Sequence, residues 1–383
     1  MSGSMNGGVN GGMRGGMRGG MIGAFDQLPE AAVLCAAAAP VPLDWARQML
    51  RQHWGLDATL EPVSGERDSN FGVLARVGGG EVKLLLKASH PDEPALVTDF
   101  QTQALLHLAR HAPALPVQRL QPAETGRHAG AASITAVAPD GRPRVLRLLH
   151  WLHGLPMPQA PRTAALRASV AGLLAQLDQA LAGLQHPAAA LQLPWDIQRA
   201  HSVASLIDAM PDAGRRALAS QALQLFQAQA LPHLAALPRQ AIHNDFNMHN
   251  LLVDPAQPEQ ASGILDFGDM LAAPRINDLA VGAAYQLDAE GDAEVGALGT
   301  VAAFAAAYHA QAPLQPAEQD LLWPLVQARL LMVVAISGWR ALRQPQDAAY
   351  LLRNNPVSWA RLQACAGVPP ARARDAIRAA CQA

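Results

Sequence analysis

The sequence predicts an α+β protein with two lobes, a small N-lobe rich in strands and a larger, mostly helical C-lobe. Two observations support this prediction. Alternating apolar patterns with glycine-rich turns are concentrated in the first 150 residues, whereas helical patterns dominate from about residue 161. A short strand-like segment at residues 241–266 interrupts the helical part. With 383 residues, half of them hydrophobic, the chain is long enough to fill two cores.

The start of the chain differs from the rest in composition. Residues 1–24 are rich in Gly and Met, and the tetrapeptide Met-Arg-Gly-Gly occurs twice in succession. Such a segment has little apolar surface to bury against the entropy of ordering it, so we expect a disordered tail. The N-lobe is expected over residues 40–150, the C-lobe over residues 151–365, and a C-terminal helix or tail over residues 366–383.

Within the N-lobe the spacing of apolar residues changes from helical to strand-like. Trp45, Met49 and Leu50 recur at helical spacing, which predicts a helix over residues 42–53. Strands are expected at residues 59–63, 71–77, 81–88, 133–138 and 145–151, with a helix at residues 95–111. Turn sequences at residues 78–80 and 139–141 join neighbouring strands into hairpins.

The C-lobe is predicted to be helical because Ala and Leu, both strong helix formers, dominate its composition. Helices are expected at residues 162–182, 200–210, 213–234, 276–289, 295–310, 316–344 and 347–365. Strand-like segments interrupt them at residues 241–245, 251–254 and 263–266. A strand–loop–strand insert inside a helical lobe points to a functional role for that insert.

The overall charge limits the kinds of partner. The net charge is −2 with His neutral, and charged residues make up 16% of the chain. Binding to nucleic acid requires a concentrated basic face, which this composition does not suggest. We therefore expect no nucleic-acid partner, and any phosphate group has to be bound by a few placed side chains.

Cysteine usage and hydropathy favour a cytoplasmic protein. Cys35, Cys365 and Cys381 have neither CxxC spacing nor a nearby His pair, so we expect free thiols instead of a zinc site or disulfide framework. The apolar run Leu321–Ile336 is too short to span a membrane and is interrupted by polar residues. The N-terminus lacks the continuous apolar segment of a secretory signal. We expect no membrane partner.

Two motifs in the strand-like insert carry the chemistry. His243–Asn250 fits the pattern H-x-D-x-x-x-x-N, and Asp266-Phe267-Gly268 follows on the next short strand. Phosphoryl transfer needs a carboxylate near the acceptor hydroxyl and oxygen ligands for a Mg²⁺ that bridges the donor phosphates. We expect Asp245 to accept or orient the hydroxyl proton. Asn250 and Asp266 are the expected metal ligands, because Mg²⁺ prefers oxygen ligands.

The other polar residues of these motifs have structural alternatives. A lone Asp-Phe-Gly sequence is weak evidence for a kinase. Both motifs in this order favour a kinase over the alternative, a polar loop whose Asp and Asn residues only cap helices and turns. His243 is expected to support the loop by hydrogen bonding. Asn247, counted here as a catalytic candidate, could position Asp245 or the acceptor, or bond only within the loop. Asp269 could orient the ligands of the metal or cap the next turn.

A nucleotide-binding site is expected upstream. Lys87 ends the strongly apolar run Leu84–Leu86, where its ammonium group would suit the donor phosphates; the alternative is a lysine that extends into solvent. The preceding loop, Ser64–Phe71, lacks the GxGxxG pattern. Its backbone N–H groups and the side chains of Ser69 and Asn70 could still meet phosphate oxygens, and Phe71 completes the predicted nucleotide-binding set.

The acidic partner of Lys87 is less clear from the sequence. A lysine of this kind commonly pairs with a Glu from the helix that follows its strand. The predicted helix at residues 95–111 contains no Glu, and Glu93 lies just before it. Asp99 and Gln101 are the two candidates within the helix.

Four strings resemble a known superfamily. They are GERDSNF at 65–71, HNDFNMHNLLVD at 243–254, GILDFGDM at 263–270 and NDLAVGAAY at 277–285. Together they resemble the aminoglycoside phosphotransferase and choline kinase superfamily, which has a protein-kinase-like fold, and are most similar to hydroxylysine kinases. The resemblance covers residues 40–360. It implies Mg²⁺-dependent transfer of the γ-phosphate of ATP or GTP to a hydroxyl group of an amino acid or amino alcohol, with 5-hydroxylysine favoured.

The acceptor is expected to be a small hydroxylated amine or amino acid. Seven residues, Asp269 to Arg275, separate the Asp-Phe-Gly motif from the next helix, which is too short for a peptide-docking segment. Asp196 and Asp278 could bind an ammonium group. Trp195, Trp339 and Trp359 could pack over such a cation, although core packing is the commoner role of Trp.

Two alternatives stay open at this point. The chain could be another kinase of the same superfamily, acting on an aminoglycoside, homoserine or choline. It could also be a pseudokinase-like module that binds nucleotide without turnover. Lys87, Asp245 and Asp266 are all present, which a module without turnover need not retain.

Overall fold

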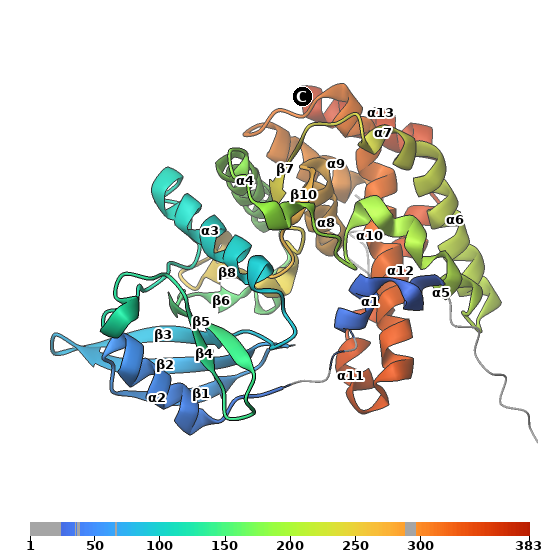
Figure 1. Ribbon diagram of the computed structural model, residues 1–383. Helices are drawn as coiled ribbons and strands as arrows, with labels where there is room; N and C mark the ends of the chain where they lie inside the picture. Colours follow the sequence, from blue (N-terminus) through green and yellow to red (C-terminus); the bar gives the residue numbers. More distant parts are fainter. Residues whose placement is uncertain (1–23, 35, 37–38, 66, 288–295) are drawn as a thin grey trace, which may run out of the picture.

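The computed structural model describes residues 24–34, 36, 39–65, 67–287 and 296–383. Nearly all of the predicted tail and Cys35 lie outside these residues. The described chain forms two lobes, as the sequence predicts: a strand-rich lobe and a larger helical lobe (Figure 1).

The N-lobe is built on a five-stranded antiparallel sheet with the order β1-β2-β3-β5-β4. Its strands are β1 (Ala58–Val63), β2 (Ser69–Val77), β3 (Gly80–Ala88), β4 (Ile134–Val137) and β5 (Pro143–His150). Helix α2 (Leu43–Trp54) covers one face of the sheet, because Trp45, Leu50 and Trp54 pack against inward-facing residues of β3 and β5 such as Leu86 and Leu148. These side chains form the core of the N-lobe.

Helix α3 (Ala95–His111) belongs to the core of the C-lobe. Phe100, Leu105 and Leu108 on α3 are buried in the same cluster as Leu149 of β5 and the helices of the C-lobe. The ring of Phe100 stacks on His186 at a centroid distance of 5.0 Å. Helix α3 thus lies between the sheet and α4 (Ala164–Leu181) and joins the lobes (Figure 1).

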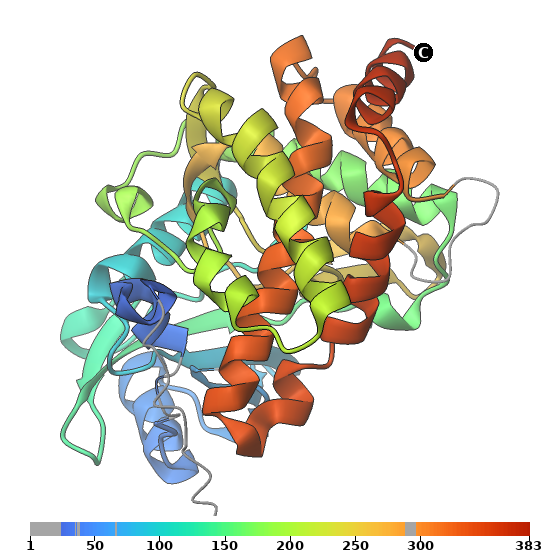
Figure 2. The same ribbon diagram turned by 90° about the vertical axis from the view of Figure 1, so that its right-hand side faces the viewer.

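The C-lobe packs around one long central helix, α10 (Pro316–Arg343). Its neighbours include α6 (Ala213–Gln229), α8 (Ile276–Gln286), α12 (Asn355–Ala366) and α13 (Pro370–Gln382). Figure 2 shows α10 running through the lobe beside α6. Helix α10 is long and apolar enough to cross a membrane, but 94% of its most apolar window is buried inside the protein. This is the arrangement of a core helix.

Smaller elements complete the C-lobe. The remaining α-helices are α1 (Pro29–Leu34), α5 (Ala204–Asp208), α7 (Leu231–Leu234), α9 (Gly296–His309) and α11 (Ala348–Leu351). Helix α13 packs against α9 and α10. The segment before the N-lobe lies on the C-lobe: Phe25 meets Trp339 edge-on, with ring centroids 5.0 Å apart, and its N–H donates to Ser205 Oγ at 3.3 Å.

Two small sheets hold the loop between residues 243 and 250. One pairs β7 (Arg239–Ile242) with β10 (Leu271–Pro274), and the other has the order β6-β8-β9, with β6 at Leu155–Pro156, β8 at Leu251–Asp254 and β9 at Gln257–Ile264. The bounds of β8 agree with the predicted strand at residues 251–254, whereas β7 shares only residues 241–242 with the predicted strand at 241–245. The sequence analysis did not predict β6 or β10. It also placed the third strand of the insert at residues 263–266, whereas β9 begins at Gln257 and ends at Ile264.

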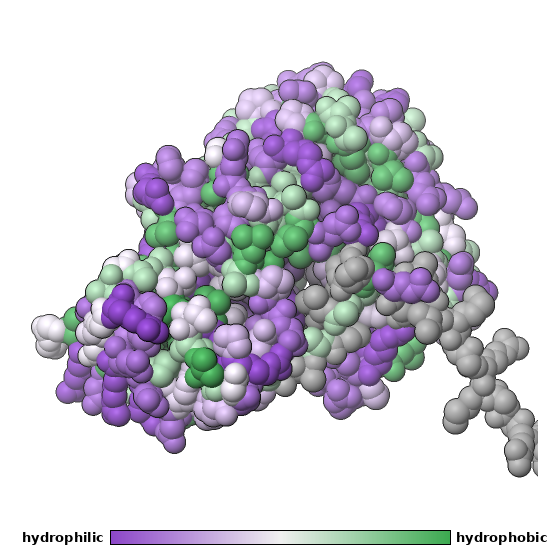
Figure 3. Space-filling view, in the orientation of Figure 1, coloured by the Kyte–Doolittle hydropathy of each residue, from purple (hydrophilic) through white to green (hydrophobic). Residues whose placement is uncertain are grey.

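Two predicted helices are divided in the structure near a proline. The expected helix at residues 347–365 separates into α11 and α12, because Pro356 occupies the first turn of α12, where a proline starts a helix but cannot continue one. The expected helix at 213–234 ends at Gln229 in the same way, with Pro232 in the first turn of α7. The face of the molecule drawn in Figure 3 is mostly hydrophilic, with scattered apolar patches.

Candidate active site

The loop between β7 and β8 is held from behind by α8. Asp278 on α8 accepts hydrogen bonds from the backbone N–H groups of His243 and Asn244, both at 2.8 Å. Asn244 has a positive φ of 63°, a conformation that Asn tolerates better than most residues. The turn ends β7 at Ile242, so Asp245 leaves the sheet and enters the loop.

His243 supports the loop from inside. It is fully buried, its Nε2 lies 3.0 Å from the carbonyl oxygen of Leu265, and its Nδ1 accepts from the Asp245 N–H at 3.3 Å. Its ring also packs against Phe267 of the Asp-Phe-Gly motif, with centroids 4.9 Å apart. His243 therefore links the two motifs, and none of these contacts requires it to act as a base.

Three side chains surround the carboxylate of Asp245. Asn247 Nδ2 and Asn250 Nδ2 each donate to Asp245 Oδ2 at 2.8 Å. Arg329 Nη2 donates to Asp245 Oδ1 at 3.0 Å. Burial raises the pKa of Asp245, while Arg329, Asn247 and His243 act to lower it. The side chain keeps 23% of its surface exposed, so the carboxylate is fixed in position and still accessible.

Arg329 was missed by sequence reasoning, which noted the polar interruptions of its apolar run only as evidence against a membrane span. It lies on α10, is 2% exposed, and has Trp195 and Tyr285 within cation–π distance, at 5.3 and 5.8 Å. Its Nη1 also donates to the Trp195 carbonyl oxygen at 3.3 Å. The sequence feature that could have identified Arg329 is its charge, because a lone Arg in an apolar helical segment needs a partner when it is buried.

Asp266 faces the N-lobe. It has a positive φ of 55°, and its Oδ1 accepts from the Gly268 N–H at 3.2 Å and lies 3.4 Å from Lys87 Nζ. Lys87 is the main reason that the pKa of Asp266 is lowered, although burial acts against it. The Asp266 side chain is 53% exposed, so this carboxylate, whose pKa is lowered, is accessible to solvent.

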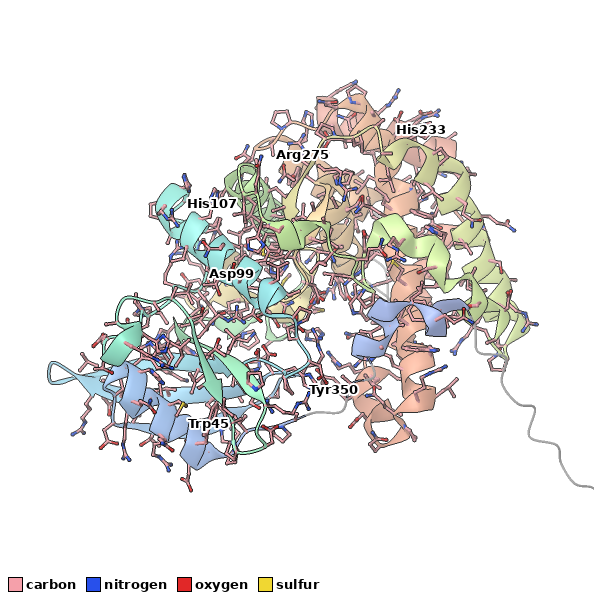
Figure 4. All side chains as sticks on the ribbon, in the orientation of Figure 1. Trp45, Asp99, His107, His233, Arg275 and Tyr350 are labelled. Carbon is pink, nitrogen blue, oxygen red and sulfur yellow. The ribbon has the colours of Figure 1, made fainter. Side chains whose placement is uncertain are left out.

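Lys87 lies between two carboxylates, and these are its acidic partners in this structure. Besides Asp266, Asp68 Oδ2 lies 3.8 Å from Lys87 Nζ. Asp99, which lies on α3 (Figure 4), instead has its Oδ2 atom 3.0 Å from His186 Nε2. Neither helix candidate forms an ion pair with Lys87. The two carboxylates beside Lys87 are therefore Asp266 and Asp68, and Asp68, in the loop before β2, accepts from the His90 N–H at 3.0 Å.

The alternation of side chains along β2 places the predicted nucleotide-binding residues on opposite faces of the sheet. Phe71 is 4% exposed in the α2 core, and Ser69 Oγ accepts from the Val41 N–H at 3.1 Å. Asn70 is paired with Lys87 across β2 and β3, which places these two side chains on the same face of the sheet. The structure thus brings Asn70 to Lys87 but turns the side chains of Ser69 and Phe71 to the opposite face.

Gly65 explains the shape of the loop before β2. A Cβ atom there would lie 2.6 Å from the Asp68 carbonyl oxygen and would collide with the Asn70 side-chain amide. Only Gly lets the loop fold back tightly enough to place Asn70 beside Lys87.

The family follows from a comparison with known sequences. Residues 59–317 match the phosphotransferase enzyme family known as APH. The chain belongs to this family. It is therefore a small-molecule kinase, an enzyme that transfers a phosphate group to a hydroxyl acceptor.

Curated relatives of this phosphotransferase include hydroxylysine kinases. The hydroxylysine kinase of Danio rerio is 27% identical over 312 residues, which cover 79% of this chain and 85% of that protein. The hydroxylysine kinase of Mus musculus is 24% identical over 324 residues, which cover 79% of this chain and 83% of that protein.

Solved structures of two kinases share the fold of this phosphotransferase. A microcompartment-associated aminopropanol kinase has a TM-score of 0.62 at 20% identity and covers 83% of this chain and 95% of its own. An amicoumacin kinase in complex with AMP-PNP, Ca²⁺ and Ami has a TM-score of 0.60 at 13% identity and covers 82% of this chain and 92% of its own.

The residues proposed for cation recognition in this phosphotransferase mostly have other partners. Asp278 is fully buried behind the loop and cannot reach an acceptor. Asp196 caps the 3₁₀ helix at Ile197–Val203 by accepting from the Gln198 N–H at 2.9 Å. The three tryptophans each lie against an arginine of the chain: Trp195 against Arg329, Trp339 against Arg343 and Trp359 against Arg215.

Proposed function

We propose that this phosphotransferase transfers the γ-phosphate of ATP or GTP to the hydroxyl group of an amino acid or amino alcohol, with 5-hydroxylysine as the favoured acceptor. The observation that carries the proposal is the fixed, accessible carboxylate of Asp245, held by three donors opposite the carboxylate of Asp266. The favoured acceptor rests on the curated relatives, which are hydroxylysine kinases.

Asp245 is the proposed catalytic carboxylate. Its burial-raised pKa suits a group that takes a proton from a hydroxyl, while Arg329 keeps it ionised and oriented. Asn247 is proposed to hold Asp245 in place, since its Nδ2 donates to Oδ2 and its own Oδ1 accepts from the His249 N–H at 2.8 Å. The loop thus fixes the direction of the carboxylate, while Arg329 on α10 favours its ionised form.

Asn250 and Asp266 are the proposed ligands of Mg²⁺. Asn250 uses its Nδ2 group on Asp245, which leaves its side-chain oxygen for a cation. Asp266 is ionised and half-exposed. Among the described residues, no three His, Cys, Asp or Glu side chains gather around one point, so the phosphates and water would complete the ligand set. When bound, the ion would neutralise charge on the transferred group.

Lys87 and Asn70 are proposed to bind the donor phosphates. Lys87 Nζ lies within 4 Å of Asp68 and Asp266, so its charge is placed beside both carboxylates while only 13% of its side chain is exposed. Ser69 and Phe71 would contribute through their backbone, because their side chains point to the other face of the sheet.

A screen of donors and acceptors tests the proposal. The purified full chain would be incubated with Mg²⁺ and either ATP or GTP, with 5-hydroxylysine, homoserine, choline, ethanolamine, aminopropanol and an aminoglycoside as acceptors. Mass spectrometry would detect the phosphorylated product, and Asp245→Asn would serve as the control. We expect 5-hydroxylysine to give the highest kcat/KM. Preference for another acceptor would reassign the substrate, and nucleotide binding without any product would favour the module without turnover.

A further inference from the structure

A row of three polar side chains crosses the N-lobe sheet next to the site. Lys87 on β3 is paired with Asn70 on β2 and with Arg147 on β5. Directly opposed residues of antiparallel strands place their side chains on the same face, about 5 Å apart at Cβ. Leu149, two residues after Arg147, packs in the C-lobe cluster, so this face is the one turned toward the C-lobe.

Arg147 is a buried cation without a hydrogen-bond partner in the part of the chain that the structure describes. It is 3% exposed, and its Nε is fully enclosed and unbonded. Arg144, three residues earlier on the opposite face, also has an unbonded Nε, but both of its Nη atoms have partners. Its Nη2 donates to Asp140 Oδ2 at 2.7 Å, and its Nη1 lies 3.3 Å from two carbonyl oxygens.

The carboxylates around Arg147 are already paired with other cations. Asp68 and Asp266 flank Lys87, and Glu93 bonds to Arg67 at 2.9 Å. All three act on Arg147 through charge alone, while burial lowers the pKa of its guanidinium. Arginine stays protonated in proteins, so Arg147 brings a full positive charge with unused donors to this face.

We propose that Arg147 is a second cationic ligand for the polyphosphate of the nucleotide donor, acting beside Lys87. This inference rests on the proposed function, which supplies a polyphosphate at this place. The planar guanidinium of arginine presents parallel N–H donors that match phosphate oxygens in a way that a single ammonium does not.

The alternative is that Arg147 only balances the three carboxylates around it. The two roles differ in what they predict for ligands. If Arg147 binds phosphate, its loss should weaken binding of the polyphosphate and leave binding of the nucleoside unchanged. If Arg147 only balances the carboxylates, its loss should disturb the fold of the N-lobe and weaken nucleoside and nucleotide binding together.

Calorimetric titration of the full chain separates these roles. The ligands would be adenosine and guanosine, their non-hydrolysable triphosphate analogues with Mg²⁺, and tripolyphosphate with Mg²⁺. Arg147→Met would be compared with the wild type and with Arg76→Met, which removes one positive charge from the exposed end of the same sheet. Thermal melting would establish that each variant is folded.

We expect Arg147→Met to weaken the binding of the triphosphate analogue and of tripolyphosphate about 10- to 100-fold, the factor for losing hydrogen bonds to a charged group. Nucleoside affinity should be unchanged, and Arg76→Met should bind all ligands as the wild type does. If Arg147→Met does not fold, Arg147→Lys carries the test, with an expected loss of about 3- to 10-fold because it keeps the charge without the planar fork.

Equal triphosphate affinity in the wild type and Arg147→Met would overturn the inference, and so would a parallel loss of nucleoside binding. In either case wild-type phosphoryl transfer would leave the proposed function intact. A wild-type protein that binds neither nucleotide nor tripolyphosphate would overturn the proposed function and this inference together.

Discussion

Arg329 and Asp245 form an ion pair with an N–O distance of 3.0 Å, which connects the middle of α10 to the loop between β7 and β8. The two residues are 84 positions apart in the sequence. The Arg329 side chain is only 3% exposed, so water does little to screen the pair. The protonation of Asp245 therefore depends on a residue outside both sequence motifs.

Replacing Arg329 should change the pH dependence of the reaction. Arg329 lowers the pKa of Asp245, so Arg329→Gln should raise that pKa. Because Asp245 has to be ionised to take a proton, the acidic limb of kcat/KM against pH should move to higher pH, with kcat/KM about 10- to 100-fold lower at pH 7. Arg329→Lys should restore part of the loss. An acidic limb at the wild-type position in Arg329→Gln would show that the pair does not set the pKa of Asp245.

Asp245→Asn should separate catalysis from binding. The substitution keeps the shape of the side chain but removes the proton acceptor, so we expect kcat to fall about 10²- to 10⁴-fold. Nucleotide affinity, measured by titration, should stay within about threefold of the wild type, because the change affects a step that follows binding. Near wild-type turnover in this variant would refute the assignment of Asp245.

Asp266→Asn should weaken the dependence on divalent metal. Lys87 lowers the pKa of Asp266, so the carboxylate is ionised through neutral pH and available to a cation. We expect the Mg²⁺ concentration for half-maximal rate to rise about tenfold or more, from the loss of a charged ligand. Asp254→Asn, at the far end of β8, is the matched control. An unchanged metal dependence in Asp266→Asn would argue against this role.

A buried pair of carboxylates behind the loop predicts how stability varies with pH. Burial and the neighbouring Asp278 raise the pKa of Asp178 well above its usual value, and Tyr308 donates to Asp178 Oδ2 at 2.6 Å. The folded protein thus holds a proton that the unfolded chain releases near pH 4. The stability that this proton contributes is complete below that pH and is lost as the pH rises through the folded-state pKa.

Asp178→Asn mimics the protonated acid, so it should remove this pH dependence. We expect its free energy of unfolding in urea to vary less than that of the wild type between pH 5 and pH 8, and to be at least as high at pH 8. Asp278→Asn is the contrasting variant. It leaves one oxygen to accept from two backbone N–H groups, so it should reduce both stability and kcat. A steeper pH dependence in Asp178→Asn would contradict the proposed proton.

The sequence was sufficient to predict the parts of the site that are formed by residues close together in the chain. Asp245, Asn247 and Asn250 lie within six residues, so one loop brings them together and a local motif is enough to predict their proximity. The two-lobed fold was predictable for a similar reason. Strand alternation and helical spacing are local signals, and the two kinds of signal occupy different parts of the chain.

The sequence was not sufficient to predict contacts between residues on different strands. The pairing of Lys87 with Asp68, and the position of Arg147 beside Lys87, depend on the register of β2, β3 and β5. A shift of one residue would move these side chains to the other face, and the sequence does not specify the register to that accuracy. The same alternation explains why Ser69 and Phe71 point away from the site that they were expected to line.

The contact of Phe25 with Trp339 has a consequence for the stability of the chain. Within the described residues, Phe25 and α1 lie on the C-lobe, the chain enters the N-lobe at α2, and it returns to the C-lobe after β5. The N-lobe is thus connected at both of its ends to segments that pack on the C-lobe. We expect a chain shortened to start at α2 to lose the contact of Phe25 with Trp339 and to have a lower free energy of unfolding in urea than the full chain.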